Sequence, residues 1–326
     1  EYILLFIITF DVIRRVTGHS FFMKYRYPAM LHTMPKNLVI FGGFAIGLIL
    51  MVSIYGVLHA RRVYVRQDPV VIEKSSSLPG LKIALIADLH LGYNSTKSHV
   101  RKIVDTINSQ NVDLVCIAGD LFDNDYNAIK DPDEVADILS DIKSRYGTYA
   151  CWGNHDVSEK ILAGFTFPQK ETIVRDGRFT EFLHHAGITM LEDETVCINN
   201  AFYLVGRRDK DMAKKEQLPR KTFAEITEPL DPSLPIIVMD HQPGELSEAS
   251  DAGVDLDLSG HTHDGQMFPA NLVIHFLWEN ACGILKKGAM TSIVTSGAGV
   301  WGPAMRVGTN NEVVIANVSF DPATDQ

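Results

Sequence analysis

Five short apolar segments of this chain each end in Asp, Asn or His, and this repeated pattern constrains the fold more than any other feature. The segments are rich in aliphatic residues and are followed by glycine or polar residues, as buried strands are. The polar residues that follow them are, in order, Asp88 and His90; Asp120 and Asp123; Asn154, His155 and Asp156; His241; and His261 and His263. The carboxyl ends of parallel strands line one crevice, so the fold would bring these side chains together.

The pattern between residues 81 and 154 alternates strands with amphipathic helices. Strands are predicted at 81–88, 113–120 and 147–154, and helices at 98–110 and 133–146. Such a series favours a parallel sheet with helices packed against it. Further strands are predicted at 202–205, 235–239, 254–258, 291–295 and 312–318. The sequence therefore predicts an α/β fold.

Residues 38–58 form an uncharged apolar run of 21 residues. As a helix this run would be about 30 Å long, which matches the hydrocarbon core of a bilayer. Lys36 precedes it, and Arg61, Arg62 and Arg66 follow at positions suited to the membrane interface. We predict a transmembrane helix at 38–58; a buried core helix and a signal peptide are the alternatives.

The other segments around this helix complete the predicted organisation. Residues 1–16 are interpreted as the tail of a transmembrane helix whose beginning is missing, and 17–37 as a basic loop. Residues 59–80 are interpreted as a connector with one short extended segment, and 81–326 as the folded domain. Basic residues flank the second span almost equally, so the positive-inside rule leaves the orientation open. We expect an integral protein of the cell (inner) membrane whose domain lies outside the bilayer.

Charge is unevenly distributed along the chain, whose net charge is −10. Residues 1–78 hold nine Lys and Arg against four Asp and Glu, whereas residues 79–326 hold 21 against 36. A domain this acidic lacks the clustered cations that non-specific nucleic-acid binding needs, so we expect no nucleic-acid partner. The four cysteines have no C-x-x-C spacing, which disfavours a zinc ribbon.

As an ordered set, the five motifs resemble those of the calcineurin-like metallophosphoesterase family. The family pattern D-x-H, G-D-x-x-D, G-N-H-D/E, a single His and G-H-x-H is present without a gap between about residues 81 and 320. The resemblance implies a metallophosphatase-type α/β/β/α sandwich, here preceded by N-terminal transmembrane helices. It also implies a pair of divalent metal ions.

The resemblance assigns a role to each motif residue. Asp88, His90 and His263 would hold one metal, and Asn154, His241 and His261 the other. Asp120 would bridge both metals. His155 matches the general acid or phosphate-contacting histidine, with Asp156 orienting it, and Asp123 matches a supporting carboxylate.

The donor set and its chemistry agree with these assignments. Carboxylate, imidazole and amide ligands without thiolate favour Mn, Fe or Zn over Mg²⁺ or Ca²⁺. Two such ions can clamp a phosphoryl group and acidify a water, so we expect a P–O bond to be hydrolysed by metal-bound hydroxide. His155 would titrate near the working pH and protonate the leaving oxygen.

Further segments resemble the YkuE/YaeI-type membrane-associated phosphodiesterases, notably 263–269 and 296–306. In that branch a Gly usually follows the last metal histidine, whereas this chain has Asp264. Arg306 is a candidate for binding substrate phosphate, because guanidinium groups suit phosphate, and Arg207 and Arg208 are weaker candidates. We expect Trp301 and Phe268 to pack in the core; lining a substrate pocket is the alternative.

These features favour a phosphodiesterase or pyrophosphatase that acts on a phosphorylated, lipid-linked or envelope substrate at the bilayer. An intermediate of the UDP-2,3-diacylglucosamine type is one candidate. The alternatives are a phosphomonoesterase of a cell-wall phosphopolymer and a non-catalytic scaffold with the same fold. A transporter is disfavoured, because the apolar segments carry no charge inside the membrane.

Overall fold

The computed structural model describes residues 36–159, 161–162, 165–166 and 175–321. The chain divides into two compact units, Glu1–Leu58 and His59–Gln326. The truncated helix predicted at 1–16 lies outside the described residues, as does the basic loop at 17–37 except for its last two residues.

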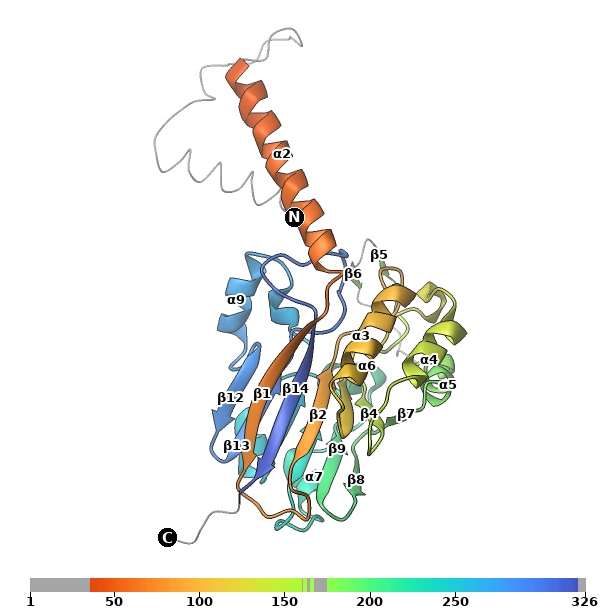
Figure 1. Cartoon of the computed structure of the whole chain (residues 1–326), viewed down its shortest axis with the longest axis vertical. Helices are drawn as coiled ribbons and strands as arrows, with labels where there is room; N and C mark the ends of the chain where they lie inside the picture. The colour runs from red at the N-terminus through yellow and green to blue at the C-terminus, as the bar shows by residue number, and fades with distance from the viewer. Residues whose placement is uncertain (1–35, 160, 163–164, 167–174, 322–326) are drawn as a thin grey trace. The chain divides into compact units, whose positions relative to one another are not determined.

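Over the predicted span, from residue 36 onward, the structure describes a continuous helix, α2 (Lys36–His59) (Figure 1). Among the described residues, its segment Gly42–His59 is the one that is long and apolar enough to cross a membrane. Large apolar side chains on it are exposed, including Phe44 at 71% and Met51 at 66%. A core helix would bury such residues, so their exposure favours the membrane interpretation over the core one.

The second unit contains two six-stranded sheets. The strand order in the first is β1 (Tyr64–Ile72), β14 (Glu312–Phe320), β2 (Leu81–Ile86), β3 (Leu114–Ala118), β4 (Thr148–Cys151) and β7 (Ile188–Met190). Strands β2, β3 and β4 are parallel, as the sequence predicts, and β7, which the sequence did not predict, continues the parallel order. Strand β14 is antiparallel to β2.

The second sheet has the order β12 (Gly283–Lys287), β13 (Met290–Val294), β11 (Leu256–Ser259), β10 (Ile236–Met239), β9 (Phe202–Gly206) and β8 (Glu194–Ile198). Its four central strands are parallel and both edge strands are antiparallel to their neighbours. A separate pair, β5 (Ile161–Leu162) and β6 (Phe165–Thr166), forms a two-stranded sheet.

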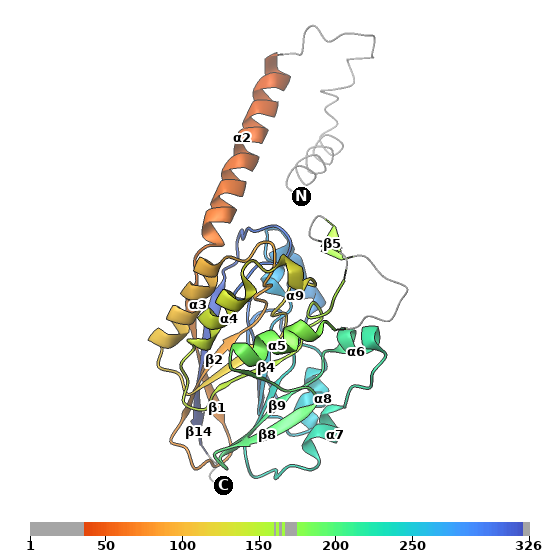
Figure 2. The same ribbon diagram turned by 90° about the vertical axis from the view of Figure 1, so that its right-hand side faces the viewer.

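Helices cover the outer face of each sheet (Figure 2). The first sheet is covered by α3 (Lys97–Ser109), α4 (Pro132–Ser140) and α5 (Gly177–His185), and the second by α7 (Phe223–Thr227) and α8 (Leu246–Asp251). The short helices η1 (Tyr126–Ala128), α6 (Lys210–Glu216), η2 (His263–Gly265) and α9 (Ala270–Leu277) complete the described elements.

The central core lies between the two sheets. Leu85 and Val314 of the first sheet pack in one buried cluster with Leu204 and Leu258 of the second. The layers are therefore helix, sheet, sheet and helix, which confirms the predicted α/β/β/α sandwich. Burying apolar side chains on both sides of each sheet explains why its central strands are continuously apolar in sequence.

The helix predicted at 133–146 is shorter than expected and ends at Ser140. Asn108 of α3 binds the chain beyond that point: its amide donates to Asp141 O at 2.9 Å and its Oδ1 accepts from Lys143 N at 2.8 Å. These contacts hold residues 141–143 in a turn, and hydrogen bonds to a neighbouring helix replace those of a further helical turn.

The segment interpreted as a connector, 59–80, contains a strand of the first sheet. β1 pairs with β14 along its full length, and its Val70 and Ile72 are buried in the central core. Because β1 is parallel to β14, which is antiparallel to β2, Tyr64 lies at the edge where β2, β3 and β4 end. The chain thus enters the second unit at the edge that carries the polar motifs.

We therefore predict that a chain starting at residue 79 is unstable, whereas one starting at His59 folds. Burial of one Val or Ile side chain contributes about 1.5–3 kcal/mol, and the shorter chain loses both buried apolar side chains of β1 and its pairing with β14. Thermal unfolding of the two purified truncations checks this. Equal unfolding temperatures would mean that β1 is dispensable.

Candidate metal centre

The five motifs meet at the carboxyl edge of the two sheets. Three groups of side chains bring potential ligand atoms within 4.8 Å of one another: Asp88, His90 and His263; His90, Asp123 and His155; and Asp120, His241 and His261. These residues follow β2, β3, β4, β10 and β11. Strand ends that are distant in sequence thus build one polar cluster, as their order predicts.

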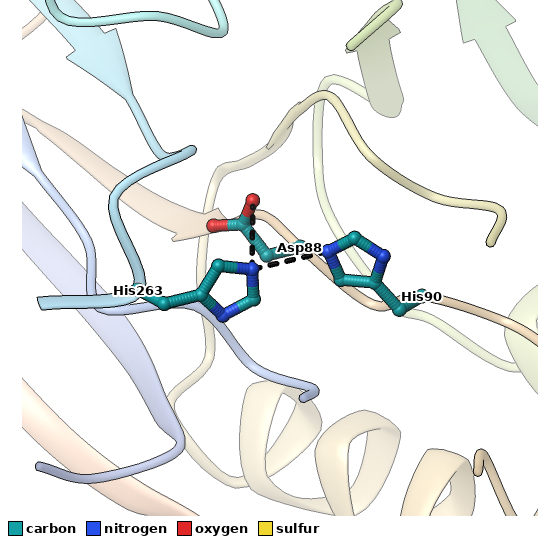
Figure 3. A group of neighbouring side chains, drawn as sticks. All are labelled: Asp88, His90 and His263. Carbon is teal, nitrogen blue, oxygen red and sulfur yellow. Dashed lines mark hydrogen bonds and ion pairs between the residues drawn. The ribbon is translucent and has the colours of Figure 1, made fainter. Parts of the chain in front are cut away.

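The first group contains the ligands expected for one metal (Figure 3). His90 Nε2 and His263 Nε2 are 3.1 Å apart, and His263 Nε2 is 3.7 Å from Asp88 Oδ1. All three residues are buried. Their ring nitrogens and carboxylate point toward one another (Figure 3), as the ligands of a single cation do.

The ligands expected for the other metal, Asn154, His241 and His261, form the second ligand group. His241 Nε2 is 3.1 Å from Asn154 Oδ1 and 3.3 Å from His261 Nδ1. His241 Nδ1 is 2.8 Å from Ala118 O, the carbonyl at the end of β3. That bond places a hydrogen on Nδ1 and leaves the Nε2 lone pair directed at the cluster, which is the tautomer a metal ligand needs.

Asp120 lies between the two groups. Its Oδ2 is 3.1 Å from His241 Nε2 and 3.8 Å from His90 Nε2, while its Oδ1 accepts the backbone N–H of His155 at 2.8 Å. The same carboxylate oxygen therefore faces a histidine from each group. This is the arrangement that a bridging ligand requires.

The backbone at the cluster is unusual. Five of the expected ligands have positive φ angles between 44° and 71°, namely Asp88, His90, Asp120, His261 and His263. Non-glycine residues adopt this left-handed region at a cost of about 1–3 kcal/mol each, and such residues concentrate at functional sites. The strand ends turn sharply here so that each side chain points into the cluster.

Glycines of the motifs allow the close approach of these segments. A Cβ on Gly153 would lie 2.2 Å from Asp120 Oδ1, and one on Gly119 would lie 2.6 Å from His241 Nδ1. Neither position can hold a side chain without displacing a ligand. The glycines in G-D and G-N-H-D are therefore required by packing against the metal ligands.

Electrostatics within the cluster favour a bound cation. Burial raises the pKa of Asp88 to about 6, against the opposing effect of His241. Burial also opposes ionisation of Asp120, but His241 and His155 outweigh it and hold the pKa of Asp120 well below its usual value. Burial and the nearby His241 lower the pKa of His261 to about 3. Buried imidazoles and carboxylates in one cluster are the donor set that a divalent ion stabilises.

His155 differs from its predicted chemistry in two respects. Burial lowers its pKa to about 4, so its ring is neutral near pH 7 and does not titrate there as expected. Its Nδ1 lies 2.5 Å from Asn124 Oδ1, so Asn124 orients the ring. Asp156 does not, because its two oxygens accept the backbone N–H groups of Phe122 and Gly153. Asp156 instead fixes the loops that carry Asp120 and His155.

Asp123 lies beside the first group. Its Oδ1 is 3.5 Å from His90 Nδ1, on the side of the ring away from His263. A carboxylate at this position fixes the orientation of a metal-binding imidazole and raises its basicity. The structure thus places Asp123 as a support for His90.

Arg306 does not bind substrate phosphate as predicted, because it is completely buried. Its guanidinium group donates to the carbonyl oxygens of His263, Ser296 and Gly299 at 2.6–3.1 Å and also to Asn311 Oδ1. Arg306 therefore ties the loop that follows β13 to the backbone of His263.

The two weaker arginine candidates also lie away from the cluster. Arg207 is buried, stacks on Phe223 at 3.7 Å and pairs with Asp240 at 3.1 Å. Arg208 pairs with Glu192 at 3.0 Å. Both guanidinium groups are held by carboxylates: that of Arg207 by Asp240, which follows β10, and that of Arg208 by Glu192, which follows β7.

A cleft of about 260 Å³ opens beside the cluster. It is lined by Asp120, His155, His261, Thr262, His263, Gly265, Gln266 and Trp301. Trp301 thus lines the cleft, with its ring 6.0 Å from that of His155. Phe268 is 47% exposed, so the expectation that both aromatic residues pack in the core is wrong.

The sequence did not identify three residues that contact the cluster. Asn124 directly follows the second motif, and its position there was the only available signal. Lys215 of α6 donates to Asn154 O at 3.0 Å, and Trp278 lies edge-on to His261 with ring centroids 5.3 Å apart. Both come from segments without motifs, so only the fold reveals their proximity.

Comparison with known proteins agrees with this geometry. Residues 81–265, more than half of the chain, match the family model described as calcineurin-like phosphoesterase. The chain belongs to the calcineurin-like metallophosphoesterase family. The match covers all five motifs of the cluster, from Asp88 to His263.

Several curated relatives of this chain are named as metallophosphoesterases or as proteins with a metallophosphoesterase domain. An uncharacterized metallophosphoesterase of Helicobacter pylori is 32% identical over 251 residues, which are 76% of this chain and 62% of the relative. A zebrafish (Danio rerio) transmembrane protein with metallophosphoesterase domain is 28% identical, over 81% of this chain and 59% of the relative. The chain thus spans about three fifths of the length of these relatives. Such a relative and helix α2 together indicate membrane association.

A more distant relative has a specific activity in its name. The UDP-2,3-diacylglucosamine pyrophosphatase LpxG of Chlamydia muridarum is 24% identical over 228 residues, which are 60% of this chain and 67% of the relative.

The buried contacts of Arg306 lead to a stability prediction. Arg306→Lys should lower the free energy of unfolding by about 3–5 kcal/mol, the usual cost of breaking a buried charged network. Chemical denaturation measures this, and Arg208→Lys is the matched control, because partly exposed ion pairs contribute about 1 kcal/mol or less. An unchanged stability with a raised KM would instead restore Arg306 as a phosphate ligand.

Proposed function

We propose that this chain is a membrane-associated, dinuclear-metal phosphoesterase that hydrolyses a phosphodiester or pyrophosphate. The observation that carries the proposal is the position of Asp120 Oδ2, which lies within 3.8 Å of a histidine from each ligand group. One shared carboxylate between two sets of imidazole and carboxylate ligands is suited to a pair of divalent ions. Mn, Fe or Zn fits the donors better than Mg²⁺ or Ca²⁺.

Each part of the cluster then has a task. Asp88, His90 and His263 would hold one ion, and Asn154, His241 and His261 the other. Ions held there would neutralise charge on the phosphoryl oxygens and lower the pKa of a water molecule. The buried, preorganised ligands keep this arrangement without reorganisation during the reaction.

His155 would manage the proton of the leaving group. Asn124 Nδ2 donates to Val157 O and Glu159, so Asn124 Oδ1 is the acceptor for the N–H at Nδ1 of His155. The Nε2 atom is then the one available to the cleft. It can take a proton from water and pass it to the leaving oxygen, so the ring is protonated only transiently, consistent with its low pKa.

The family, one relative and the candidate span support the proposed substrate class. The family and the likeness to a protein named a UDP-2,3-diacylglucosamine pyrophosphatase support a lipid-linked pyrophosphate or diester. A candidate membrane span at the start of the chain supports a substrate that partitions into the bilayer. We therefore favour a nucleotide-linked or envelope lipid over a water-soluble monoester.

Two substitutions separate metal binding from proton transfer. Asp120→Asn should abolish turnover and reduce the content of both metals, because it removes the shared anion. His155→Ala should retain the metals and lower kcat by about 10²–10⁴, the usual contribution of a group that transfers a proton. Metal analysis and hydrolysis of bis-p-nitrophenyl phosphate by the Mn²⁺-loaded full chain measure both effects.

A substrate panel completes the experiment. Wild-type chain should hydrolyse lipid-linked pyrophosphates or diesters faster than monoesters of the same lipid. Loss of metal in His155→Ala would contradict its assigned role. A metal-loaded wild-type chain that hydrolyses no ester would favour a scaffold with this fold.

A further inference from the structure

Helix α9 is apolar but buries none of its residues. The α9 surface consists of five large apolar side chains that are 47–88% exposed: Phe268, Leu272, Val273, Phe276 and Leu277. Residues 265–278 contain no Asp, Glu, Lys or Arg, although the domain around them is strongly acidic. A contiguous exposed apolar surface of this kind marks a contact with another apolar phase.

The α9 surface is directly connected to the metal centre. His275 Nε2 of α9 lies 3.0 Å from Asp264 Oδ1, and Asp264 follows the metal-ligand candidate His263. Trp278, at the end of α9, contacts the ring of His261. The carboxyl end of the helix is therefore fixed to segments that carry expected metal ligands, and Gly265 and Gln266, which precede the helix, line the cleft.

The α9 surface also lies near the point where the chain enters the second unit. Residues 307–311 link the two: Val307 O accepts from Phe268 N at 2.8 Å, and Thr309 Oγ1 donates to Gln266 O at 2.8 Å. In the same loop, Thr309 O is 3.1 Å from His59 Nε2, and Asn311 Nδ2 donates to Ala60 O at 2.6 Å. One short loop thus joins the start of this unit to the start of α9.

We propose that the α9 surface is a second membrane contact, which inserts into the lipid interface and holds the cleft at the bilayer surface. The candidate span ends at His59, so the entry point of the second unit must lie at that surface. The α9 surface is attached to the same loop and is uncharged. It is followed by Trp278, and Trp is a residue type enriched at lipid interfaces. This inference rests on the proposed function only for the substrate that the cleft would receive.

A lipid surface fits these observations better than a protein partner. A stable protein interface surrounds its apolar centre with a polar rim and hydrogen bonds. Residues 265–278, which carry the α9 surface, contain no charged side chain. The loop to which this surface is attached also contacts His59, where the candidate span ends. Insertion of the α9 surface would leave the metal ligands outside the hydrocarbon, because Asp88, His90 and His241 are buried within the folded unit.

Fluorescence quenching tests the contact without depending on activity. The full chain, with Cys197 and Cys282 replaced by Ser, receives Phe276→Cys, is labelled with nitrobenzoxadiazole and is placed as one copy per lipid nanodisc. Doxyl-labelled lipids should quench this label severalfold more than a label on native Cys197 in a Cys282→Ser chain. Cys197 is the matched control because it is exposed and pairs with Tyr203 near the amino end of β9, the opposite edge of the sheet.

Hydrolysis gives a second readout in the same nanodiscs. The double variant Leu272→Gln and Phe276→Gln should lower turnover of a lipid-embedded phosphodiester severalfold and leave turnover of bis-p-nitrophenyl phosphate unchanged. Val71→Gln is the matched control, since Val71 is 45% exposed at the far end of β1.

The outcomes separate this inference from the proposed function. Equal quenching at positions 276 and 197 would overturn the membrane contact, and so would a blue-shifted label that lipid quenchers do not reach, because a protein segment would then cover α9. Unchanged turnover of the lipid substrate in the double variant would overturn it as well. If no ester is hydrolysed by the wild type, the proposed function fails, while quenching still decides the contact.

Discussion

The buried carboxylate of Asp120 is the constraint on which the rest of this structure depends. Only 1% of its surface is exposed, yet it faces histidines from two groups and accepts the backbone N–H of His155. An isolated buried carboxylate is costly, so its environment must supply positive charge. The left-handed backbone at the expected ligands turns their side chains toward Asp120. The glycines between the loops let these segments approach closely.

The layered fold explains why the cluster can be so compact. Parallel strands in both sheets end at one edge, and each contributes a short loop whose first polar residues face the same point. Because β14 is antiparallel to β2 and β1 is parallel to β14, the start of β1 lies at this same edge. The chain therefore enters the folded unit there. The metal centre, the cleft, α9 and the approach to the candidate span consequently share one end of the folded unit. The proposed hydrolysis at a lipid surface would use that arrangement directly.

The sequence predicted the strands that carry the motifs and the gathering of the motif residues at one edge, because both depend on local pattern. Continuous apolar runs identify buried strands, and polar residues directly after them identify the strand ends. The sequence did not predict the role of a residue where that role depends on burial. The guanidinium group of Arg306 is of a type that binds phosphate, but it is enclosed by backbone carbonyl oxygens. Residues 59–80 were interpreted as a connector with one short extended segment, and the structure pairs that segment, β1, with β14 at the edge of the first sheet, where its Pro69 is tolerated. Contacts of Asn124 and Trp278 with the cluster depend on tertiary structure alone.

The central claim is that Asp120 is shared by two metal ions. Crystals of the chain grown with Mn²⁺ and measured at the manganese absorption edge test it most directly. The account predicts two anomalous peaks about 3.5–4 Å apart, with an oxygen of Asp120 within ligand distance of both. A single peak, or two peaks of which only one contacts Asp120, would contradict it.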